Sequence, residues 1–295
     1  MLKPPAGVAN LLADNFFVTR RLFFIPLLSL GLSCAGLVKT GPLRMELVLD
    51  QDGVVAGQDC WVGWRIIREK GWHTYWKHPG DVGVPPTLQW EMPTGFNAGE
   101  LLYAPPVKVK MGSIRANGNY GETLYLTKLG VPDGLTIGET YNLRAKASWL
   151  TCSQQCLPGF ADLSLDVLVV GTSSPNPIWR QRFEEFRKNI PRTIAPEWKV
   201  TAVEDNNMIH LSFIHKNLGK MEKSPPVFFS ADRLTRSNGS QFISTERNSI
   251  TLRMEKSEWA KEGLNILSGL VYREKGWGDG FNGTYRRIRI PLTNG

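Results

Sequence analysis

Residues 140–159 read TYNLRAKASWLTCSQQCLPG, and this stretch predicts both the class of fold and the place of the chemistry. In its first half, apolar residues alternate with polar ones, at Tyr141, Leu143, Ala145, Ala147 and Trp149. A period of two is typical of a β-strand with one buried face. In its second half Cys152 and Cys156 lie four positions apart, and Pro158-Gly159 is a turn signal. The stretch therefore predicts a strand that ends close to a pair of cysteines.

Similar alternating runs occupy much of the chain on either side. They predict strands near residues 45–49, 60–66, 87–90, 123–129 and 163–169. Turn signals separate these runs, for example at Pro79-Gly80-Asp81 and Pro132-Asp133-Gly134. Short alternating strands with frequent turns are typical of an all-β sandwich. We expect this sandwich to occupy residues 41–172.

A helix and a second group of strands are expected after the sandwich. Residues 173–194 predict a linker and an amphipathic helix, with Asn176 as the cap and Pro177 at the first helical position. One stripe of this helix is apolar, which indicates core packing: Trp179, Phe183, Phe186 and Ile190. Alternation returns after Trp198, so residues 195–295 predict a second, smaller β-sandwich-like domain.

The first forty residues are typical of an export signal. Arg20-Arg21 precede an uncharged apolar segment over residues 22–38, where small residues cluster around Cys34. A cleaved signal is the main interpretation; a lipid on Cys34 or an uncleaved anchor are the alternatives. All three place the remaining chain in an exported, periplasmic location.

Charge gives little support for a nucleic-acid surface. The formal net charge is +8, from 35 Lys and Arg against 27 Asp and Glu, but basic and acidic residues are interspersed. Proteins that bind nucleic acid commonly have a basic stripe or patch. No nucleotide-binding motif and no hydrolase motif was recognised either, so the cysteines carry most of the functional information.

The chain has four cysteines, and three remain once the leader is set aside. Cys60 alternates with apolar residues on the inward face of a predicted strand, which indicates a buried core residue. Cys152 and Cys156 cannot form a disulfide within a regular strand, because four extended residues span about 13 Å. A disulfide needs Cα atoms about 4.4–6.8 Å apart, so the chain would have to fold back in a tight loop.

The residues themselves leave three roles open for this pair. As a structural disulfide its small ring would contribute only about 2 kcal/mol. As a metal site it lacks the second ligand pair that zinc prefers, although Cu(I) accepts two thiolates. As a redox pair it needs no cofactor, and small exposed disulfides are often exchangeable.

Three blocks and their order resemble the N-terminal domain of the DsbD family of exported thiol:disulfide interchange proteins, including its ScsB-like branch. The blocks are GWHTYWKHPGDVGVPPTLQW at 71–90, NYGETLYL at 119–126 and SWLTCSQQCLPG at 148–159. The resemblance covers residues 44–170 closely and continues more weakly to the end of the chain. It implies an immunoglobulin-like β-sandwich whose Cys152 and Cys156 cycle between dithiol and disulfide.

The resemblance also implies partners and neighbouring residues. A thioredoxin-like or membrane electron-transfer protein would supply electrons, and exported proteins would receive them, without cofactor or metal. His73 and Tyr75 would lie beside the disulfide, and Tyr120 would lie in a loop that caps it. The family's membrane and thioredoxin-like domains have no counterpart in this sequence, so a stand-alone module is expected. As an enzyme it would be a protein-disulfide reductase component; the alternatives are a binding module with a structural disulfide and a periplasmic Cu(I)-handling protein.

Overall fold

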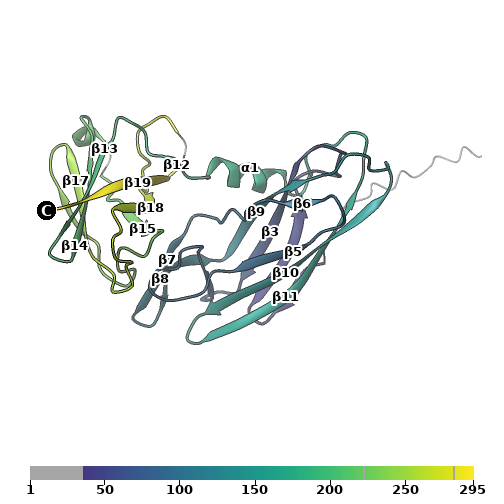
Figure 1. Cartoon of the computed structure of the whole chain (residues 1–295), viewed down its shortest axis with the longest axis horizontal. Helices are drawn as coiled ribbons and strands as arrows, with labels where there is room; N and C mark the ends of the chain where they lie inside the picture. Colours follow the sequence, from purple (N-terminus) through teal and green to yellow (C-terminus); the bar gives the residue numbers. More distant parts are fainter. Residues whose placement is uncertain (1–35, 222, 282) are drawn as a thin grey trace, which may run out of the picture. The chain divides into compact units, whose positions relative to one another are not determined.

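The computed structural model describes residues 36–295 except 222 and 282 (Figure 1). The expected export signal, with Arg20-Arg21 and Cys34, lies outside the described residues apart from its last few positions. No helix among the described residues is long and apolar enough to cross a membrane. This part of the chain is all-β, with one short α-helix and one 3-10 turn, η1 (Leu218–Lys220). The predicted fold class is confirmed.

The first sheet contains five strands in the order β1-β2-β3-β9-β6. Their bounds are β1 (Val38–Thr40), β2 (Leu43–Leu49), β3 (Cys60–Arg68), β6 (Asn97–Ala98) and β9 (Glu122–Gly130). The predicted alternation is present: on β2 and β3, every second side chain is fully buried. β3 is the central strand, and it pairs antiparallel with β2 on one side and with β9 on the other.

The second sheet carries the cysteine pair. Its strands follow the order β11-β10-β4-β8-β7, and β5 also pairs with β10. Their bounds are β4 (His73–Tyr75), β5 (Thr87–Glu91), β7 (Val107–Met111), β8 (Ile114–Tyr120), β10 (Thr140–Cys152) and β11 (Cys156–Leu168). β10 and β11 form one long hairpin, which lies along one side of the sheet (Figure 1).

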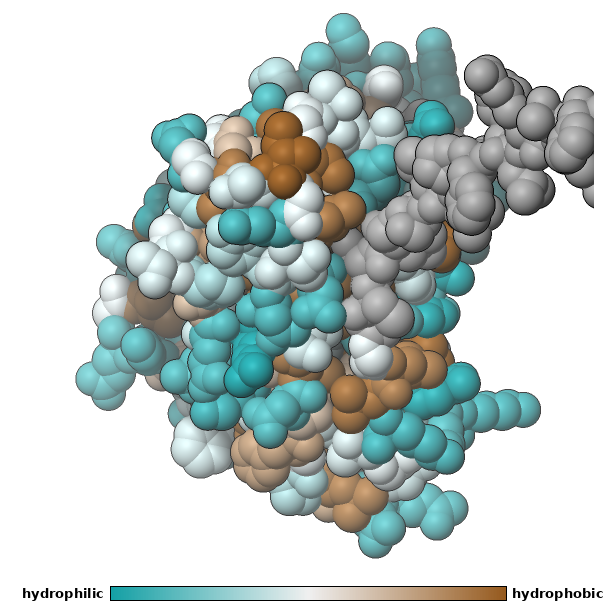
Figure 2. Space-filling model, turned by 90° about the vertical axis from the view of Figure 1, so that its right-hand side faces the viewer, coloured by the Kyte–Doolittle hydropathy of each residue, from teal (hydrophilic) through white to brown (hydrophobic). Residues whose placement is uncertain are grey.

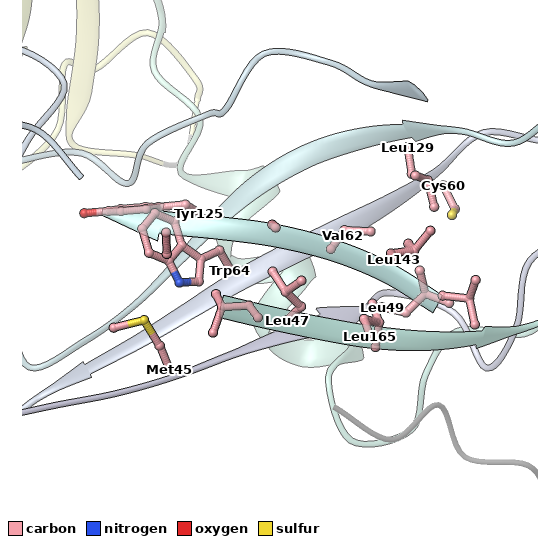
Figure 3. Packing of buried hydrophobic residues seen from close by; sticks show 14 of the residues in the cluster. Met45, Leu47, Leu49, Cys60, Val62, Trp64, Tyr125, Leu129, Leu143 and Leu165 are labelled. Atoms are coloured by element: carbon pink, nitrogen blue, oxygen red, sulfur yellow. The ribbon is translucent and has the colours of Figure 1, made fainter. Parts of the chain in front are cut away.

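The two sheets pack face to face around one hydrophobic core, as in an immunoglobulin-like sandwich. Figure 3 shows this core: Leu47 and Trp64 from the first sheet face Leu143 and Leu165 from the second. Trp64 is 1% exposed and contacts the ring of Tyr125 edge-on. Burial of large apolar side chains of this kind is the main free-energy gain on folding, at about 25 cal/mol per Å².

The β10–β11 hairpin is longer than the sequence predicts. β10 continues past Trp149 to Cys152, and Pro158-Gly159 lies inside β11 rather than in a turn. The turn interpretation was wrong because β11 is an edge strand. Proline has no backbone N–H, and on an edge strand this costs no hydrogen bond where the position faces away from the neighbouring strand. Gly159 is needed there because a Cβ would lie 2.4 Å from the Trp149 ring. The extended hairpin carries the cysteines to its tip.

The predicted helix is present as α1 (Arg180–Lys188). It begins three residues later than expected, although the Asn176 side chain does accept hydrogen bonds from the backbone N–H groups of Ile178 and Trp179. Phe183 is fully buried against residues of the first sandwich, among them Val48. Core packing therefore explains the apolar stripe, as predicted.

The third sheet has eight strands, in the order β15-β18-β19-β13-β14-β17-β16 with β12 beside β19. Their bounds are β12 (Arg192–Thr193), β13 (Lys199–Asp205), β14 (Met208–Ile214), β15 (Val227–Ser230), β16 (Phe242–Thr245), β17 (Ser249–Glu255), β18 (Ile266–Tyr272) and β19 (Tyr285–Asn294). It has its own core, which includes Trp198, Phe213 and Trp277. The division into domains at 41–172 and 195–295 stays a prediction.

The surface is mixed in character. Figure 2 shows small patches of hydrophobic residues among hydrophilic ones on the face that it draws. Isolated exposed hydrophobic residues of this kind are usual on protein surfaces and need no special explanation.

Candidate functional site

Cys152 and Cys156 form a disulfide at the tip of the β10–β11 hairpin. They are opposite each other in the register, with Cα atoms 4.1 Å apart. The three residues between them make the loop, which is closed by a hydrogen bond from the Ser153 N–H to the Gln155 carbonyl oxygen. The chain folds back between the cysteines as the spacing argument requires.

A row of residues crosses the second sheet from this disulfide. Cys156 on β11 is opposite Cys152 on β10, which is opposite His73 on β4, which is opposite Tyr120 on β8. Residues directly opposite in adjacent strands lie close enough for their side chains to interact. Tyr75 follows His73 by two positions and therefore shares its face of the sheet. The register thus brings all five predicted site residues into one region.

The two cysteine residues differ in their exposure. Cys152 is 0% exposed, whereas Cys156 lies on the surface of the hairpin tip. An incoming thiolate must approach the sulfur that it attacks, and this difference in exposure favours Cys156 over Cys152 as the point of attack. Attack there would make Cys152 the leaving group. The amino-acid sequence alone does not distinguish the roles of the two cysteines, and their burial does.

The Tyr75 hydroxyl contacts the sulfur of Cys152. Its hydroxyl oxygen lies 3.2 Å from Cys152 Sγ, and both side chains are buried. A disulfide sulfur carries no hydrogen, so the phenol must donate this hydrogen bond. Burial raises the pKa of Tyr75, which keeps the hydroxyl protonated and able to donate. A hydrogen bond to a sulfur that becomes negative favours its departure as thiolate.

His73 is a neutral neighbour of the disulfide. It is 1% exposed, and its ring contacts the rings of Tyr75 and Tyr120 edge-on. Burial, with a smaller contribution from the positive Arg68, lowers the pKa of His73 to about 4. Its Nδ1 atom is buried without a hydrogen-bond partner. His73 therefore brings no positive charge to Cys152 near neutral pH. The polar group in contact with Cys152 Sγ is the Tyr75 hydroxyl.

Met111 is a neighbour of the disulfide that the sequence did not reveal. It ends β7, and its Sδ atom lies 3.4 Å from Cys156 Sγ. Tyr120, which we expected in this covering position, is 39% exposed, and its hydroxyl accepts a hydrogen bond from the Lys110 N–H. The role of Tyr120 as a cap stays a prediction. The contact of Met111 depends on where the β7–β8 hairpin places its tip relative to the disulfide, which no local sequence signal indicates.

Arg68 lies behind the site and was also not predicted. It is 4% exposed, and its guanidinium donates to Thr74 Oγ1 at 2.9 and 2.7 Å and to the Gly121 carbonyl oxygen at 3.1 Å. Thr74 lies between His73 and Tyr75 on β4, so these bonds fix the strand that carries both side chains.

Cys60 lies away from this site. It starts β3, is 3% exposed and packs beside Leu129 at the end of the core far from Tyr125 (Figure 3). Burial, with smaller contributions from Asp50 and Asp59, raises the pKa of the Cys60 thiol to about 12. The prediction of a buried core cysteine is confirmed. Among the described residues, no group of three or more His, Cys, Asp or Glu side chains is arranged to hold a metal ion.

Comparisons with known proteins agree with this geometry. The model of the family described as "Thiol:disulfide interchange protein DsbD, N-terminal" matches residues 46–167. No curated protein matches the chain.

Among solved structures, the N-terminal periplasmic domain of ScsB from Proteus mirabilis is similar, with a TM-score of 0.64 at 15% identity. The alignment covers 88% of this chain and 98% of that one, which shows a shared fold over both sandwich and third sheet. The sporulation control protein Spo0M from Bacillus subtilis is a much weaker match, with a TM-score of 0.22 at 9% identity over 85% of this chain and 91% of that one. Residues 46–167 therefore form a domain of the DsbD N-terminal family, with the expected Cys152–Cys156 disulfide.

Proposed function

We propose that this chain is an exported thiol:disulfide interchange module that relays electron pairs through Cys152 and Cys156. The observation that carries the proposal is the asymmetry of the disulfide: Cys156 is exposed, and Cys152 is buried under the Tyr75 hydroxyl. In the proposed relay Cys156 is the cysteine that a partner attacks, and Cys152 is held where its negative charge can be stabilised. A purely structural disulfide needs neither feature.

The reduction of the module would follow two displacements. A thiolate of a thioredoxin-like dithiol attacks Cys156 Sγ, a mixed disulfide forms, and Cys152 leaves with the electron pair as thiolate, stabilised by the Tyr75 hydroxyl. The second thiolate of the partner then attacks the partner's own sulfur in the mixed disulfide and releases Cys156. The partner becomes a disulfide, and the module gains two electrons and, on protonation, two protons.

The oxidation of the module would reverse these roles. Cys156 thiolate attacks a disulfide of an exported protein, and Cys152 then attacks Cys156 Sγ to close the ring and release the reduced substrate. This makes the chain a component of a protein-disulfide reductase system that needs no cofactor. We propose a periplasmic location for it, because the apolar N-terminal segment has the pattern of an export signal.

Trapping of the mixed disulfide tests this proposal. Cys152→Ser leaves the exposed Cys156 without its partner. A stable adduct should therefore form with a thioredoxin-like protein whose second cysteine is replaced by serine and whose first cysteine is activated as a mixed disulfide with thionitrobenzoate, because neither protein then has a thiol that can resolve the new bond. Cys156→Ser leaves only the buried Cys152 and should give little adduct, and Cys60→Ser serves as the matched control that leaves the pair intact. Equal adduct formation by both single variants, or none by either, would contradict the proposed role of Cys156.

Copper handling is the second candidate, and Met111 is the observation that favours it. After reduction, two thiolates and the Met111 thioether would form a group of soft sulfur donors, which suits Cu(I). Titration of the reduced protein with Cu(I) against a chromophoric chelator tests this. Retention of Cu(I) by the wild type but not by Met111→Leu would support it, and equal loss of Cu(I) from both would exclude a role for the thioether.

A further inference from the structure

Asp81 connects the loop after β4 to the loops of the third sheet. Its carboxylate accepts hydrogen bonds from the Ser237 N–H at 2.8 Å and from Ser257 Oγ at 2.8 Å. It also accepts from Ser237 Oγ at 3.1 Å and, at 3.3 Å, from the N–H of Asn238. The Asp81 N–H in turn donates to Ser237 Oγ at 2.9 Å. Hydrogen bonds to an ionised carboxylate are stronger than neutral ones, so this cluster fixes the loop firmly.

Two glycines near Asp81 allow the loop to pack closely on both sides. A Cβ on Gly80 would lie 2.2 Å from the Ser237 side chain, and a Cβ on Gly83 would lie 2.2 Å from the Tyr75 ring. Both glycines have φ near +100°, a conformation that favours glycine over other residues. The loop is therefore in direct contact with the third sheet's loops on one side and with Tyr75 on the other.

Tyr75 links the loop to the disulfide, because its ring contacts Gly83 and its hydroxyl contacts Cys152 Sγ. Gly83 packs on the ring whose hydroxyl donates to Cys152 Sγ at 3.2 Å. A second contact fixes the β7–β8 hairpin, which carries Met111, because the Arg115 N–H donates to Asn238 Oδ1 at 2.8 Å. Residues 237–238, far from the cysteines in the sequence, thus contact both the loop that packs on Tyr75 and the hairpin that carries Met111.

We propose that Asp81 is a positioning residue for the redox centre: it holds the loop of residues 80–84 against Tyr75, so that the phenol stays on Cys152 Sγ when the disulfide opens. The inference rests on the proposed function for its biological meaning. It assigns the third sheet a part in the chemistry, since Ser237 and Ser257 supply the donors that hold Asp81.

The test is the rate at which dithiothreitol reduces the disulfide at pH 7. Its thiolate attacks Cys156 Sγ, Cys152 leaves as thiolate, and the reagent closes to its own cyclic disulfide. Asp81→Asn keeps the size of the side chain but turns an NH₂ group toward N–H and O–H donors. We expect reduction to slow about fivefold in this variant, and by about the same factor in Tyr75→Phe.

The double variant separates positioning from a general structural effect. If Asp81 acts through Tyr75, Asp81→Asn combined with Tyr75→Phe should be about as slow as either single variant, and not about 25-fold slower. Tyr285→Phe is the matched control, because it removes a hydrogen bond from the third sheet to the Pro106 carbonyl oxygen without touching this loop. It should leave the rate unchanged.

Two results would overturn the inference: an unchanged rate in folded Asp81→Asn, or full additivity in the double variant. Should Asp81→Asn not fold, Ser257→Ala removes one donor to the carboxylate, and it must slow reduction in the same direction. Dithiothreitol needs no protein partner, so these rates test Asp81 even where the trapping experiment fails. If no adduct is trapped but the double variant is as slow as the single variants, the proposed function would be rejected and the role of Asp81 would stand.

Discussion

Replacement of His73 by phenylalanine should remove much of the acid sensitivity of this fold. The pKa of His73 is lowered from 6.5 to about 4, by burial first and by Arg68 second. Between these two pH values the unfolded chain binds a proton on His73 and the folded chain does not, so protonation favours unfolding. The stabilisation is complete above pH 6.5 and is lost as the pH falls toward 4.

The size of the effect follows from the two pKa values. The difference of 6.5 − 4, or about 2.5 pH units, corresponds to about 3 kcal/mol at about 1.4 kcal/mol per unit. His73→Phe keeps an aromatic ring between Tyr75 and Tyr120 and also removes the unpartnered Nδ1 atom. The variant should therefore lose about 3 kcal/mol less stability than the wild type between pH 7.5 and pH 4.

Urea unfolding at pH 7.5, 6, 5 and 4 measures this difference directly. The comparison between the two proteins cancels the contribution of Asp and Glu residues that titrate in the same range. His210→Gln, on β14 of the third sheet, is the control for replacing a histidine elsewhere. Parallel loss of stability in the wild type and in His73→Phe would refute the argument that His73 is buried in its neutral form.

Three further predictions test other groups. In a Cys156→Ser background, Tyr75→Phe should raise the pKa of the Cys152 thiol by about one unit, measured by the pH dependence of alkylation, whereas Tyr120→Phe should not. Cys60 should resist iodoacetamide at pH 8 in the folded, reduced protein, because burial raises the pKa of its thiol to about 12; mass spectrometry showing rapid labelling of Cys60 would contradict this. Burial lowers the pKa of Lys108 to about 8, so the folded chain releases this proton before the unfolded chain does, and stability should gain from Lys108 as the pH rises from 8 toward 10.5. Urea unfolding should show that gain in the wild type and not in Lys108→Met.

The sequence predicts the strands well where one face of a strand is buried. The alternation around Leu47, Trp64 and Leu143 identifies core strands because side chains on successive positions point to opposite faces. The ends of strands are harder to predict. Pro158-Gly159 has the composition of a turn, and only the position of β11 at the edge of the sheet makes proline acceptable there.

The site was predictable in its chemistry but incompletely in its geometry. The spacing of Cys152 and Cys156 requires a tight loop, and the resemblance to a known family points to His73 and Tyr75. Met111 and Asp81 could not be found in this way, since their contacts join segments far apart in the chain. Met111 on β7 contacts Cys156 on β11, and Asp81 accepts a hydrogen bond from Ser237, more than 150 positions later in the chain.

The reduction potential of the Cys152–Cys156 couple distinguishes a redox relay from a structural disulfide. It would be measured in glutathione buffers on residues 41–295, with Cys60→Ser as background. For a relay we expect a value between about −150 and −270 mV, in the range of proteins that exchange disulfides. A value below about −300 mV would indicate a structural disulfide and would contradict the proposed relay in favour of a binding module.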